Sequence, residues 1–540
     1  MNDAKKLFDT VVDKDLCTLC GTCIGVCPTN ALNFYKNTLS ANENLCVSCG
    51  KCNAVCPGAD FSYSLYNGLL FLNEDNIDSS NIGYYTHIYK GWATDSDIRI
   101  SASSGGAVTA ILCSLIKSNV IDGAVVIRET TMGAYEPIIA RTESEILASS
   151  QSKYQFIPTN TIINFLLQQP GKYAYVGLPC QVQGLRKAME ETTLLKEKIS
   201  YIFGIFCGFN MFKEATDFLI KKSSISANKI KSLEYRSNQD GETGFKIVSD
   251  DDEVYFLPKH NYTFLNFFFS AERCMKCYDL TAEFADISFG DAWEYENCSR
   301  IIVRNKIGDS ALNCALQDGL YIEDSSEQDI LSTQMQLIKH KKKYIVQRAK
   351  LFKNFPEYDT EYVTIGTVQK VKACVFYYLY HICSGTLGKT IINLIPMKLL
   401  GWSSNFIRGI LSGSSRAVIL YLFTGALATL FNFLGFIILN LFLDFRIANF
   451  IAIIITKPFV YYTNKKIVFK SKTVGAISSI KEFFRFILAR GFTGAVDFFG
   501  LILLVQVFLI NENIGKGFLI VLTTILNYMI GKKRVFVGEK

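Results

Sequence analysis

The pattern of apolar and polar positions differs from one part of the chain to the next. Between about residues 91 and 330, short apolar runs such as Ala124–Ile127, Tyr173–Val176 and Ile199–Phe206 alternate with longer stretches of helical period. Short apolar runs are typical of buried strands, and strands that alternate with helices indicate an α/β architecture. We therefore predict an α/β domain at residues 63–355.

The last quarter of the chain is more apolar. Residues 417–443 contain no charged side chain, and this stretch is longer than the ~20 residues that cross the hydrocarbon core of a bilayer. We predict an all-α transmembrane domain of four helices at residues 416–540, after a linker at 356–415 that holds interfacial helices. The other three spans are expected at Ile447–Asn464, Phe486–Ile510 and Gly517–Gly531.

The distribution of basic residues predicts the orientation of these helices. Lys and Arg crowd the segments after the second and the fourth span, whereas residues 511–516 contain one Lys. The positive-inside rule then places both termini and the preceding domains in the cytoplasm, as in a multi-pass protein of the cell membrane. The modest net charge of +7 does not indicate a nucleic-acid partner.

A separate basic run, Lys339–Lys343 followed by Arg348 and Lys350, precedes this membrane part. Such a run is typical of a solvated helix face, and next to a membrane it can lie against anionic lipid.

Three ionisable residues, Lys457, Arg490 and Asp497, fall inside the predicted spans. Charges at that depth are costly, so we expect them to face the bundle interior and to pair or bind a polar ligand. An ion pair between Lys457 and Asp497 is the favoured arrangement. A packing salt bridge and a site for a lipid phosphate explain these residues equally well.

Eight cysteines in the first sixty residues follow one spacing twice, C-x-x-C-x-x-C-x-x-x-C-P. In this spacing three thiolates bind one 4Fe-4S cluster and the fourth reaches a second cluster. A disulfide framework or two zinc sites are the alternatives, but zinc sites often use His and none of the four His lies nearby. We predict one cluster on Cys17, Cys20, Cys23 and Cys56, and another on Cys46, Cys49, Cys52 and Cys27.

This segment resembles bacterial two-cluster ferredoxins over about residues 10–60, which implies an α+β ferredoxin-like domain at residues 1–62. Clusters of this kind require reduced thiolates, which agrees with a cytoplasmic location.

Four later cysteines also have a pattern. Cys180 stands where a strand ends and a helix begins, Cys207 follows another strand, and Cys274 and Cys277 form a close pair. Because strand ends on one edge of a sheet lie near each other, these four cysteines can converge on a third cluster. The remaining cysteines are expected to be small buried apolar side chains: Cys113, Cys298, Cys314, Cys374 and Cys383.

Two polar segments are candidates for ligand binding. Ser101–Thr109 runs into a helical stretch, and Ser and Gly at a helix start suit a phosphate or the pyrophosphate of a dinucleotide, although a plain capped helix has the same composition. In Ala285–Trp293, Asp286 and Asp291 flank an apolar strand, where they orient a ligand or cap turns.

Together these segments resemble the coenzyme F420 hydrogenase/dehydrogenase beta subunit family of iron-sulfur flavoproteins. The resemblance rests on S-S-G-G-x-x-T at 103–109, S-K-Y at 152–154, G-x-P-C-Q at 177–181, C-x-x-C at 274–277, A-D-I-S-x-G-D-x-W at 285–293, and Arg304 with Gly308. It implies an FAD whose phosphates lie at Ser103, Ser104, Gly105, Gly106 and Thr109. It also implies Lys153 near the flavin ring or substrate, with Asp291 as a second catalytic candidate, and Cys180, Cys207, Cys274 and Cys277 as cluster ligands.

The membrane part contains an internal repeat. Residues 432–436 match 497–501, and residues 461–469 match 528–536, each copy of the second pair ending in K-K-x-V-F. A four-span domain with this ending resembles the GtrA-like family, which implies a role with polyprenyl-phosphate sugars in cell-surface polysaccharide synthesis.

Two functional hypotheses follow. The first is a membrane-anchored oxidoreductase that passes electrons from a ferredoxin-like donor through 4Fe-4S clusters and FAD to an unidentified substrate, in cell-surface polysaccharide biosynthesis. The alternative is GtrA-like translocation of a polyprenyl-phosphate-linked sugar, with the redox domain as a regulator or a dock for a partner.

Overall fold

The structure of the protein is a computed structural model. It describes residues 2–394 apart from 36–37, 73, 75–76, 132, 240–241, 318 and 361–364, and then Tyr421, Thr424, Gly425, 445–469, 476–502 and 512–536. The chain divides into two compact units, residues 1–404 and 405–540. Each unit is described by itself.

The two copies of the N-terminal cysteine spacing share one backbone conformation. A short helix in each copy begins after a left-handed glycine, Gly21 at φ 83° and Gly50 at φ 76°. Leu19 and Ser48, two residues before these glycines, also have positive φ, at 58° and 50°. The repeat in the sequence is therefore a structural repeat. Its elements are α1 (Asp3–Leu7), η1 (Phe8–Val12), α2 (Thr22–Gly25), β1 (Leu32–Tyr35), β2 (Thr38–Ala41), η2 (Glu43–Leu45) and α3 (Lys51–Ala54).

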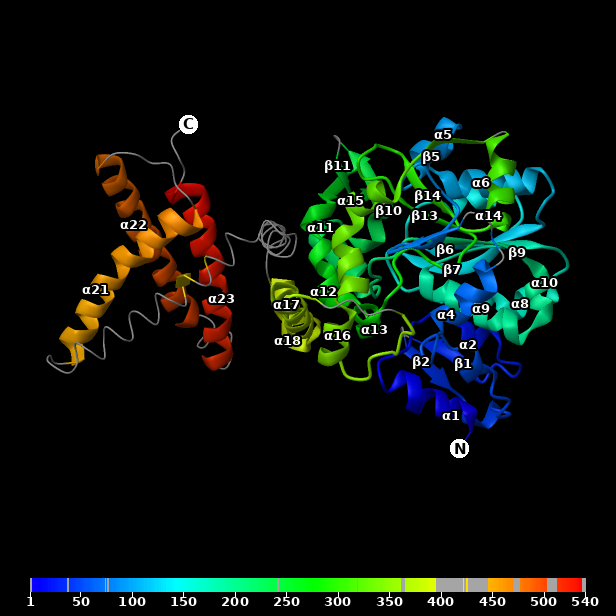
Figure 1. Ribbon diagram of the computed structural model, residues 1–540, viewed down its shortest axis with the longest axis horizontal. Coiled ribbons are helices and arrows are strands. Elements are labelled where there is room, and N and C mark those ends of the chain that lie inside the picture. Colours follow the sequence, from blue (N-terminus) through cyan, green and yellow to red (C-terminus); the bar gives the residue numbers. More distant parts are fainter. Residues whose placement is uncertain are drawn as a thin grey trace. The chain divides into compact units, whose positions relative to one another are not determined.

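An eight-stranded mixed sheet forms the centre of the first unit, in the order β15-β5-β14-β13-β9-β8-β6-β7 (Figure 1). Strands β6, β8, β9 and β13 are parallel, so their carboxyl ends share one edge, the edge where α/β proteins bind ligands. The predicted α/β architecture is confirmed. The strands are β5 (His87–Ala93), β6 (Gly123–Thr131), β7 (Ala134–Ala140), β8 (Tyr173–Gly177), β9 (Ile199–Ile205), β13 (Ile287–Asp291), β14 (Ser299–Val303) and β15 (Leu320–Asp324).

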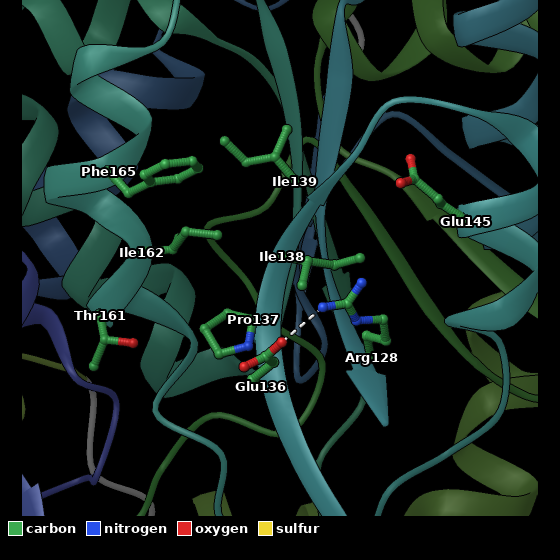
Figure 2. Close-up of a pocket in the computed structure, with 9 residues that line it drawn as sticks. All are labelled: Arg128, Glu136, Pro137, Ile138, Ile139, Glu145, Thr161, Ile162 and Phe165. Atoms are coloured by element: carbon green, nitrogen blue, oxygen red, sulfur yellow. Dashed lines mark hydrogen bonds and ion pairs between the residues drawn. The ribbon is translucent and has the colours of Figure 1, made fainter. Parts of the chain in front are cut away.

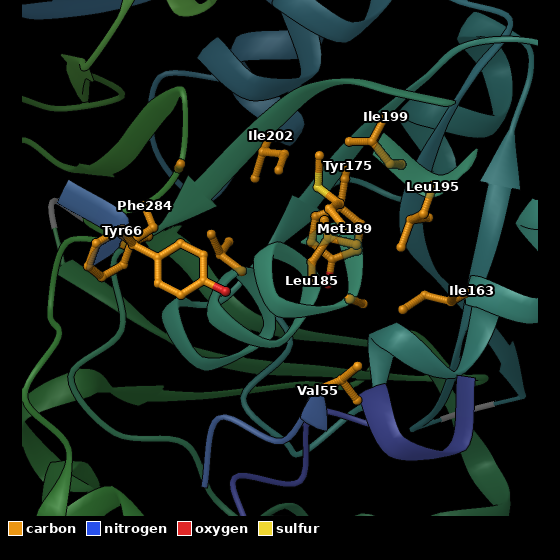
Figure 3. Close-up of a cluster of buried hydrophobic side chains, with 14 of the residues drawn as sticks. Val55, Tyr66, Ile163, Tyr175, Leu185, Met189, Leu195, Ile199, Ile202 and Phe284 are labelled. Atoms are coloured by element: carbon orange, nitrogen blue, oxygen red, sulfur yellow. The ribbon is translucent and has the colours of Figure 1, made fainter. Parts of the chain in front are cut away.

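Helices cover both faces of this sheet. Helices α6 and α14 lie on one face, and α8, α9 and α10 on the other (Figure 1). Figure 3 shows Leu185 and Met189 of α9 between the sheet residue Ile202 and Val55 of the ferredoxin-like part. The ferredoxin-like part therefore shares a hydrophobic core with α9. The helices are α4 (Tyr63–Phe71), α5 (Ser96–Ser101), α6 (Ala107–Lys117), α7 (Glu143–Ala148), α8 (Ile163–Gln168), α9 (Pro179–Glu191), α10 (Thr193–Lys198) and α14 (Lys306–Leu316).

A second sheet of three antiparallel strands stands apart from the first and was not predicted. Its strands enclose Phe245 and Ile247, which are fully buried, together with Leu265 from the segment that follows. The strands are β10 (Ile230–Gln239), β11 (Glu242–Ser249) and β12 (Val254–Pro258), and the helices beside them are α11 (Glu214–Ser223), α12 (Asn266–Phe269) and α13 (Glu272–Lys276).

The basic run after α15 (Glu327–Ile338) does not form the predicted solvated or lipid-facing helix face. Lys339–Lys343 forms a π-helical turn, η7, and His340 and Lys341 are buried. Arg348 of α16 (Ile345–Leu351) is buried as well. The prediction was wrong because the turn packs onto the rest of the first unit, where these side chains donate hydrogen bonds to buried acceptors.

The linker contains two helices, α17 (Thr367–Ser384) and α18 (Thr386–Leu394). Helix α17 packs on the rest of the first unit, where buried Tyr380 donates a hydrogen bond to the carbonyl oxygen of Ser270 over 3.2 Å. Val375, Tyr378 and Ile382 are exposed on the same helix. Helix α17 thus has one packed side and a row of exposed apolar side chains.

In the second unit, the repeated sequence again has a structural counterpart. A π-helical turn follows α21 (Phe445–Thr463) and another follows α23 (Glu512–Ile530), and these turns are η8 (Asn464–Val468) and η10 (Gly531–Val535). Phe469 and Phe536, which end the two copies, stack with ring centroids 5.0 Å apart. The ends of the two copies therefore meet.

Three predicted spans fall on α21, α22 (Ala476–Ile502) and α23, although residues 503–510 of the span on α22 lie outside the described residues. The span at 417–443 lies almost entirely outside them. Within the part of the chain that the structure describes, no helix meets the length and apolarity needed to cross a membrane. The four-span arrangement is not confirmed.

Candidate functional site

The first cysteine set lines one cavity. Cys17, Cys20 and Cys23 stand around α2, and Cys56 comes from the second copy of the motif; all four border the cavity beside Leu19 and Pro57. Burial raises the pKa of Cys17 to about 12, with Cys56 and Cys20 adding to the effect. The structure therefore brings together the four residues predicted to share a cluster.

The second set is nearer the surface. Cys46, Cys49 and Cys52 interact electrostatically, and burial raises the pKa of Cys52 to about 11. The Cys27 sulfur accepts a hydrogen bond from the backbone N–H of Ala31 over 3.3 Å. Although burial opposes it, this bond and the N–H of Thr29 lower the pKa of Cys27. The sulfur is thus arranged to carry negative charge.

The third set converges at the carboxyl edge of the sheet. Cys180 lies at the start of α9 after β8, Cys207 follows β9, and Cys274 and Cys277 come from α13 and its C-cap. All four line one cavity, together with Thr18 and Leu19 of the ferredoxin-like part. Burial raises the pKa of Cys180, and Cys20 of the first set raises it further. The first and third sets are therefore neighbours.

In the described residues, no group of three or more His, Cys, Asp or Glu is arranged to hold a single metal ion. The donor set of the third cavity nevertheless fits a four-iron cube, in which each thiolate binds a different iron. The same cavity is bordered by the buried cations Arg273 and Lys341, and the Lys341 ammonium donates a hydrogen bond to the Cys277 sulfur over 3.4 Å. An anionic group in this cavity would have favourable surroundings.

The Ser-Gly turn before α6 makes some of its hydrogen bonds within the protein. The Ser299 hydroxyl accepts a hydrogen bond from the N–H of Gly105 over 3.0 Å and is 3.0 Å from the Ser104 hydroxyl. A side chain at Gly105 would meet the carbonyl oxygen of Gly91 at 2.5 Å, so glycine is required there for packing. Gly106 is the N-cap of α6 at φ 74°, and no described side chain caps the helix. The first amides of α6 can therefore bind an anion.

Lys153 and Asp291 lie in a polar region beside this turn. The Ser103 hydroxyl accepts a hydrogen bond from the N–H of Ser152 over 2.8 Å, which brings the S-K-Y segment to the turn. The Lys153 ammonium donates to the carbonyl oxygens of Ser149 and Ser150. Burial lowers the pKa of Lys153 to about 8, against the opposing effect of Glu129.

Asp291 forms an ion pair with Arg236 of β10, and this arginine lies over the Trp293 ring, 4.9 Å from its centroid. Lys259 lies over the same ring at 3.9 Å. Arg236 and Lys259 were not predicted, since Arg236 belongs to the unpredicted second sheet, Lys259 directly follows its last strand, and no motif marks them.

The S-K-Y segment continues toward the third cysteine cavity. Phe156 and Ile157 line that cavity, and Asn210 donates a hydrogen bond to the carbonyl oxygen of Gln155 over 3.0 Å. Residues 152–157 therefore connect the anion-binding turn with the cysteines.

Asp286 and Arg304 are structural. The Asp286 carboxylate accepts hydrogen bonds from Arg186 at 2.8 Å, the N–H of Ile202 at 2.7 Å and Asn305 at 2.9 Å. Arg304 donates to backbone carbonyl oxygens, among them that of Thr281 at 3.0 Å. The hydrogen bonds of the Asp286 carboxylate are therefore made within the fold.

The other predicted residues lie in different surroundings. Cys113 and Cys298 are buried as expected, whereas Cys314, Cys374 and Cys383 are only partly buried. In the second unit, Arg490 donates a hydrogen bond to the Tyr421 hydroxyl over 3.1 Å, and Lys457 is exposed. The Asp497 side chain is outside the described residues, so its ion pair with Lys457 stays a prediction.

A separate hollow lies at the edge strand β7 (Figure 2). Ile139 and Pro137 of β7 face Ile162 and half-exposed Phe165, and on the other side Arg128 pairs with Glu136 over 2.8 Å. It contains none of the predicted site residues.

Four family models match the chain. They are the coenzyme F420 hydrogenase/dehydrogenase beta subunit N-terminus at residues 88–164 and C-terminus at 171–329, the 4Fe-4S binding domain at 10–33, and the GtrA/DPMS transmembrane domain at 420–536.

Individual relatives agree with these matches. The coenzyme F420 hydrogenase subunit beta of Methanothermobacter thermautotrophicus is 30% identical over 250 residues, which are 44% of this chain and 84% of that protein. The coenzyme F420-dependent sulfite reductase of Methanocaldococcus jannaschii is 27% identical over 335 residues, 59% of this chain and 49% of that protein. The cell wall teichoic acid glycosylation protein GtcA of Listeria monocytogenes is 36% identical over 127 residues, 23% of this chain and 88% of that protein.

Among solved structures, a chain of the F420-reducing [NiFe] hydrogenase complex from Methanosarcina barkeri matches with a TM-score of 0.43 at 23% identity, over 51% of this chain and 93% of that one.

Proposed function

The chain belongs to the coenzyme F420 hydrogenase/dehydrogenase beta subunit family and has a GtrA-like part, and we propose that it is a membrane-anchored iron-sulfur flavoprotein oxidoreductase. One observation carries the proposal. The Cys180 sulfur of the third cysteine set lies 3.9 Å from the carbonyl oxygen of Thr18, which stands between Cys17 and Cys20 of the first set. Neighbouring redox sites of this kind are what a chain of single-electron carriers requires.

The cysteines are assigned to three 4Fe-4S clusters, two on the N-terminal eight and one on the third set. FAD is assigned to the start of α6, at Ser103, Ser104, Gly105, Gly106 and Thr109, supported by the uncapped amides of that helix. When bound, the clusters carry single electrons and the flavin exchanges electron pairs with an organic substrate. The task of Lys153 and Asp291 is to bind and orient the flavin or the substrate.

The substrate is assigned to the sugars or lipid-linked sugars of cell-surface polysaccharide synthesis, with a ferredoxin-like protein as electron donor. The similarity to a protein named for teichoic acid glycosylation supports this class of substrate. The proposed location is the cytoplasmic face of the cell membrane, with both termini on that side. The exposed row Val375, Tyr378 and Ile382 of α17 supports contact of this helix with the bilayer surface.

Anaerobic purification tests the proposal directly. We expect about twelve irons and twelve acid-labile sulfides per chain, since three clusters carry four irons each, and one flavin. A reductant should bleach the flavin, and a lipid-linked sugar substrate should reoxidise it. A flavin-free protein would overturn the flavoprotein assignment, and about eight irons would overturn the third cluster.

The affinity for flavin or substrate should change with pH as Lys153 loses its proton. Its pKa of about 8 means that the ammonium is present below pH 8 and is lost above it. If the ammonium binds an anionic group of the flavin or substrate, affinity should fall about tenfold per pH unit above that pKa.

Two variants of Lys153 show whether its charge is responsible for this pH dependence. In Lys153→Arg the charge persists at high pH, so the affinity should be independent of pH between 7 and 9. In Lys153→Met it should be uniformly low. Flavin and substrate titrations across this pH range measure both, and a pH-dependent affinity in Lys153→Met would exclude Lys153 as the group responsible.

GtrA-like translocation of a polyprenyl-phosphate-linked sugar, with the first unit as regulator or dock, is the second candidate. The stacked Phe469 and Phe536 favour it, because they show that the duplicated ends of the second unit form a joint structure. Bound polyprenyl phosphate in a protein whose first unit does not react with reductants would support this candidate over the first.

A further inference from the structure

Several cationic side chains are buried near the third cysteine set. Lys341, Arg273 and Arg348 are 1%, 6% and 1% exposed. Lys341 and Arg348 lie beyond residue 329, where the family match ends. The basic run that contains Lys341 is therefore a feature of this chain outside the matched region.

The hydrogen-bond acceptors of these cations are neutral groups or sulfur. Lys341 donates to the carbonyl oxygen of Asp279 at 2.7 Å and to the Cys277 sulfur at 3.4 Å. Arg348 donates to the carbonyl oxygens of Met275 at 2.6 Å and Cys277 at 3.2 Å. Arg273 donates to the Tyr358 hydroxyl at 3.0 Å.

Among the described residues, none of the three cations forms a salt bridge with a carboxylate. The neighbouring Lys342 does, with Glu283 at 2.7 Å. The buried Asp279 carboxylate lies close by but makes other hydrogen bonds, which it accepts from the N–H of Glu283 over 3.1 Å and from Gln183 over 3.4 Å. Burial of unpaired cations is strongly unfavourable. The cavity that Lys341 and Arg273 border is therefore matched to an anionic occupant.

A four-iron cube on four thiolates is such an occupant, because its ligands bring four negative charges and reduction adds another electron without moving a proton. Hydrogen bonds to the sulfurs and nearby charge set the potential of such clusters. We propose that Lys341 is a positioning and tuning residue for the cluster of Cys180, Cys207, Cys274 and Cys277, whose reduction potential it raises. This inference rests on the third cluster of the proposed function.

The direction of the effect follows from the charges. A cation next to Cys277 stabilises the more negative, reduced form. Electrons that arrive from the N-terminal clusters therefore find a more favourable acceptor beside Cys180. The π-helical turn η7 places Lys341 beside Cys277. This turn follows α15 directly and buries Lys341, while Lys342 pairs with Glu283. Such turns are frequent at functional sites.

The test is a dye-mediated redox titration of the purified full chain, followed by electron paramagnetic resonance. In Lys341→Met we expect the equilibrium constant for reduction of one cluster to fall at least about tenfold, a shift of about 59 mV to lower potential for a one-electron couple. The other two clusters should keep their potentials. Lys343→Met is the matched control, because the Lys343 ammonium in the same turn contacts none of the described cysteine sulfurs.

Further variants keep the test decisive. Lys341→Arg should restore the potential, whereas Lys341→Gln, a neutral donor, should restore it only in part. If the Lys341→Met protein does not retain the cluster, the reduction potential of the cluster in Lys341→Gln tests the proposal instead. Loss of the cluster from Met and Gln but not Arg supports the proposal, and loss from all three overturns it.

Iron analysis separates this inference from the proposed function. About eight irons in the wild type remove the third cluster itself. About twelve irons with an unchanged potential in Lys341→Met overturn the tuning role alone.

Discussion

Replacing Cys180 by serine is expected to lower the iron content from about twelve to about eight per chain, because one 4Fe-4S cluster loses a ligand. Electrons supplied to the N-terminal clusters should then no longer reduce the flavin. Cys180 links the third set to the first, because it lines the third cavity and its sulfur lies 3.9 Å from the carbonyl oxygen of Thr18, between Cys17 and Cys20. Iron and sulfide analysis measures the loss, and stopped-flow bleaching of the flavin measures the interruption.

The control is Cys314→Ser. Cys314 is a partly buried cysteine of α14 whose sulfur lies 3.6 Å from the Ser118 hydroxyl, so serine should be accommodated there without change in iron or flavin reduction. Flavin that is reduced at the wild-type rate in Cys180→Ser would show that the third cysteine set is not on the electron path.

Local spacing explains why the N-terminal set could be predicted from the sequence. The left-handed Gly21 and Gly50 recur with the cysteines, so each motif copy carries its own backbone geometry. The third set could also be inferred, because Cys180 and Cys207 follow parallel strands whose ends must share an edge. In both cases the arrangement depends on neighbours in sequence or on sheet topology.

The burial of Lys341 could not be predicted from the sequence in this way. A run of four lysines and a histidine is the composition of a solvated surface, and nothing in it indicates that its third residue is 1% exposed. The burial depends on the π-helical turn and on carbonyl oxygens contributed by residues about sixty positions earlier. Arg236 and Lys259 were not predicted for the same reason, since their partners are Asp291 at the end of β13 and Trp293 just after it, which come much later in the chain.

Asp286 is the clearest case of a motif residue whose role only its partners reveal. Its side chain is 3% exposed and forms an ion pair with Arg186, 9% exposed, while the N–H of Ile202 and the Asn305 amide complete its hydrogen bonds. These partners come from α9, β9 and the N-cap of α14. A single carboxylate therefore links three elements beneath the edge that carries Cys180 and Cys207.

Asp286→Ala is expected to destabilise the first unit by about 3–5 kcal/mol, because it leaves the Arg186 charge buried without a partner. For a unit of this size the unfolding midpoint should fall by at least about 5 °C. Thermal unfolding of the full chain in detergent, monitored by release of the flavin, measures the shift.

The double variant Asp286→Leu with Arg186→Met replaces both charges by apolar groups and should recover much of the lost stability. If Asp286→Ala instead unfolds at the wild-type temperature, the hydrogen bonds of Asp286 contribute little to the stability of the fold. Asp286 is then again a candidate for binding a ligand.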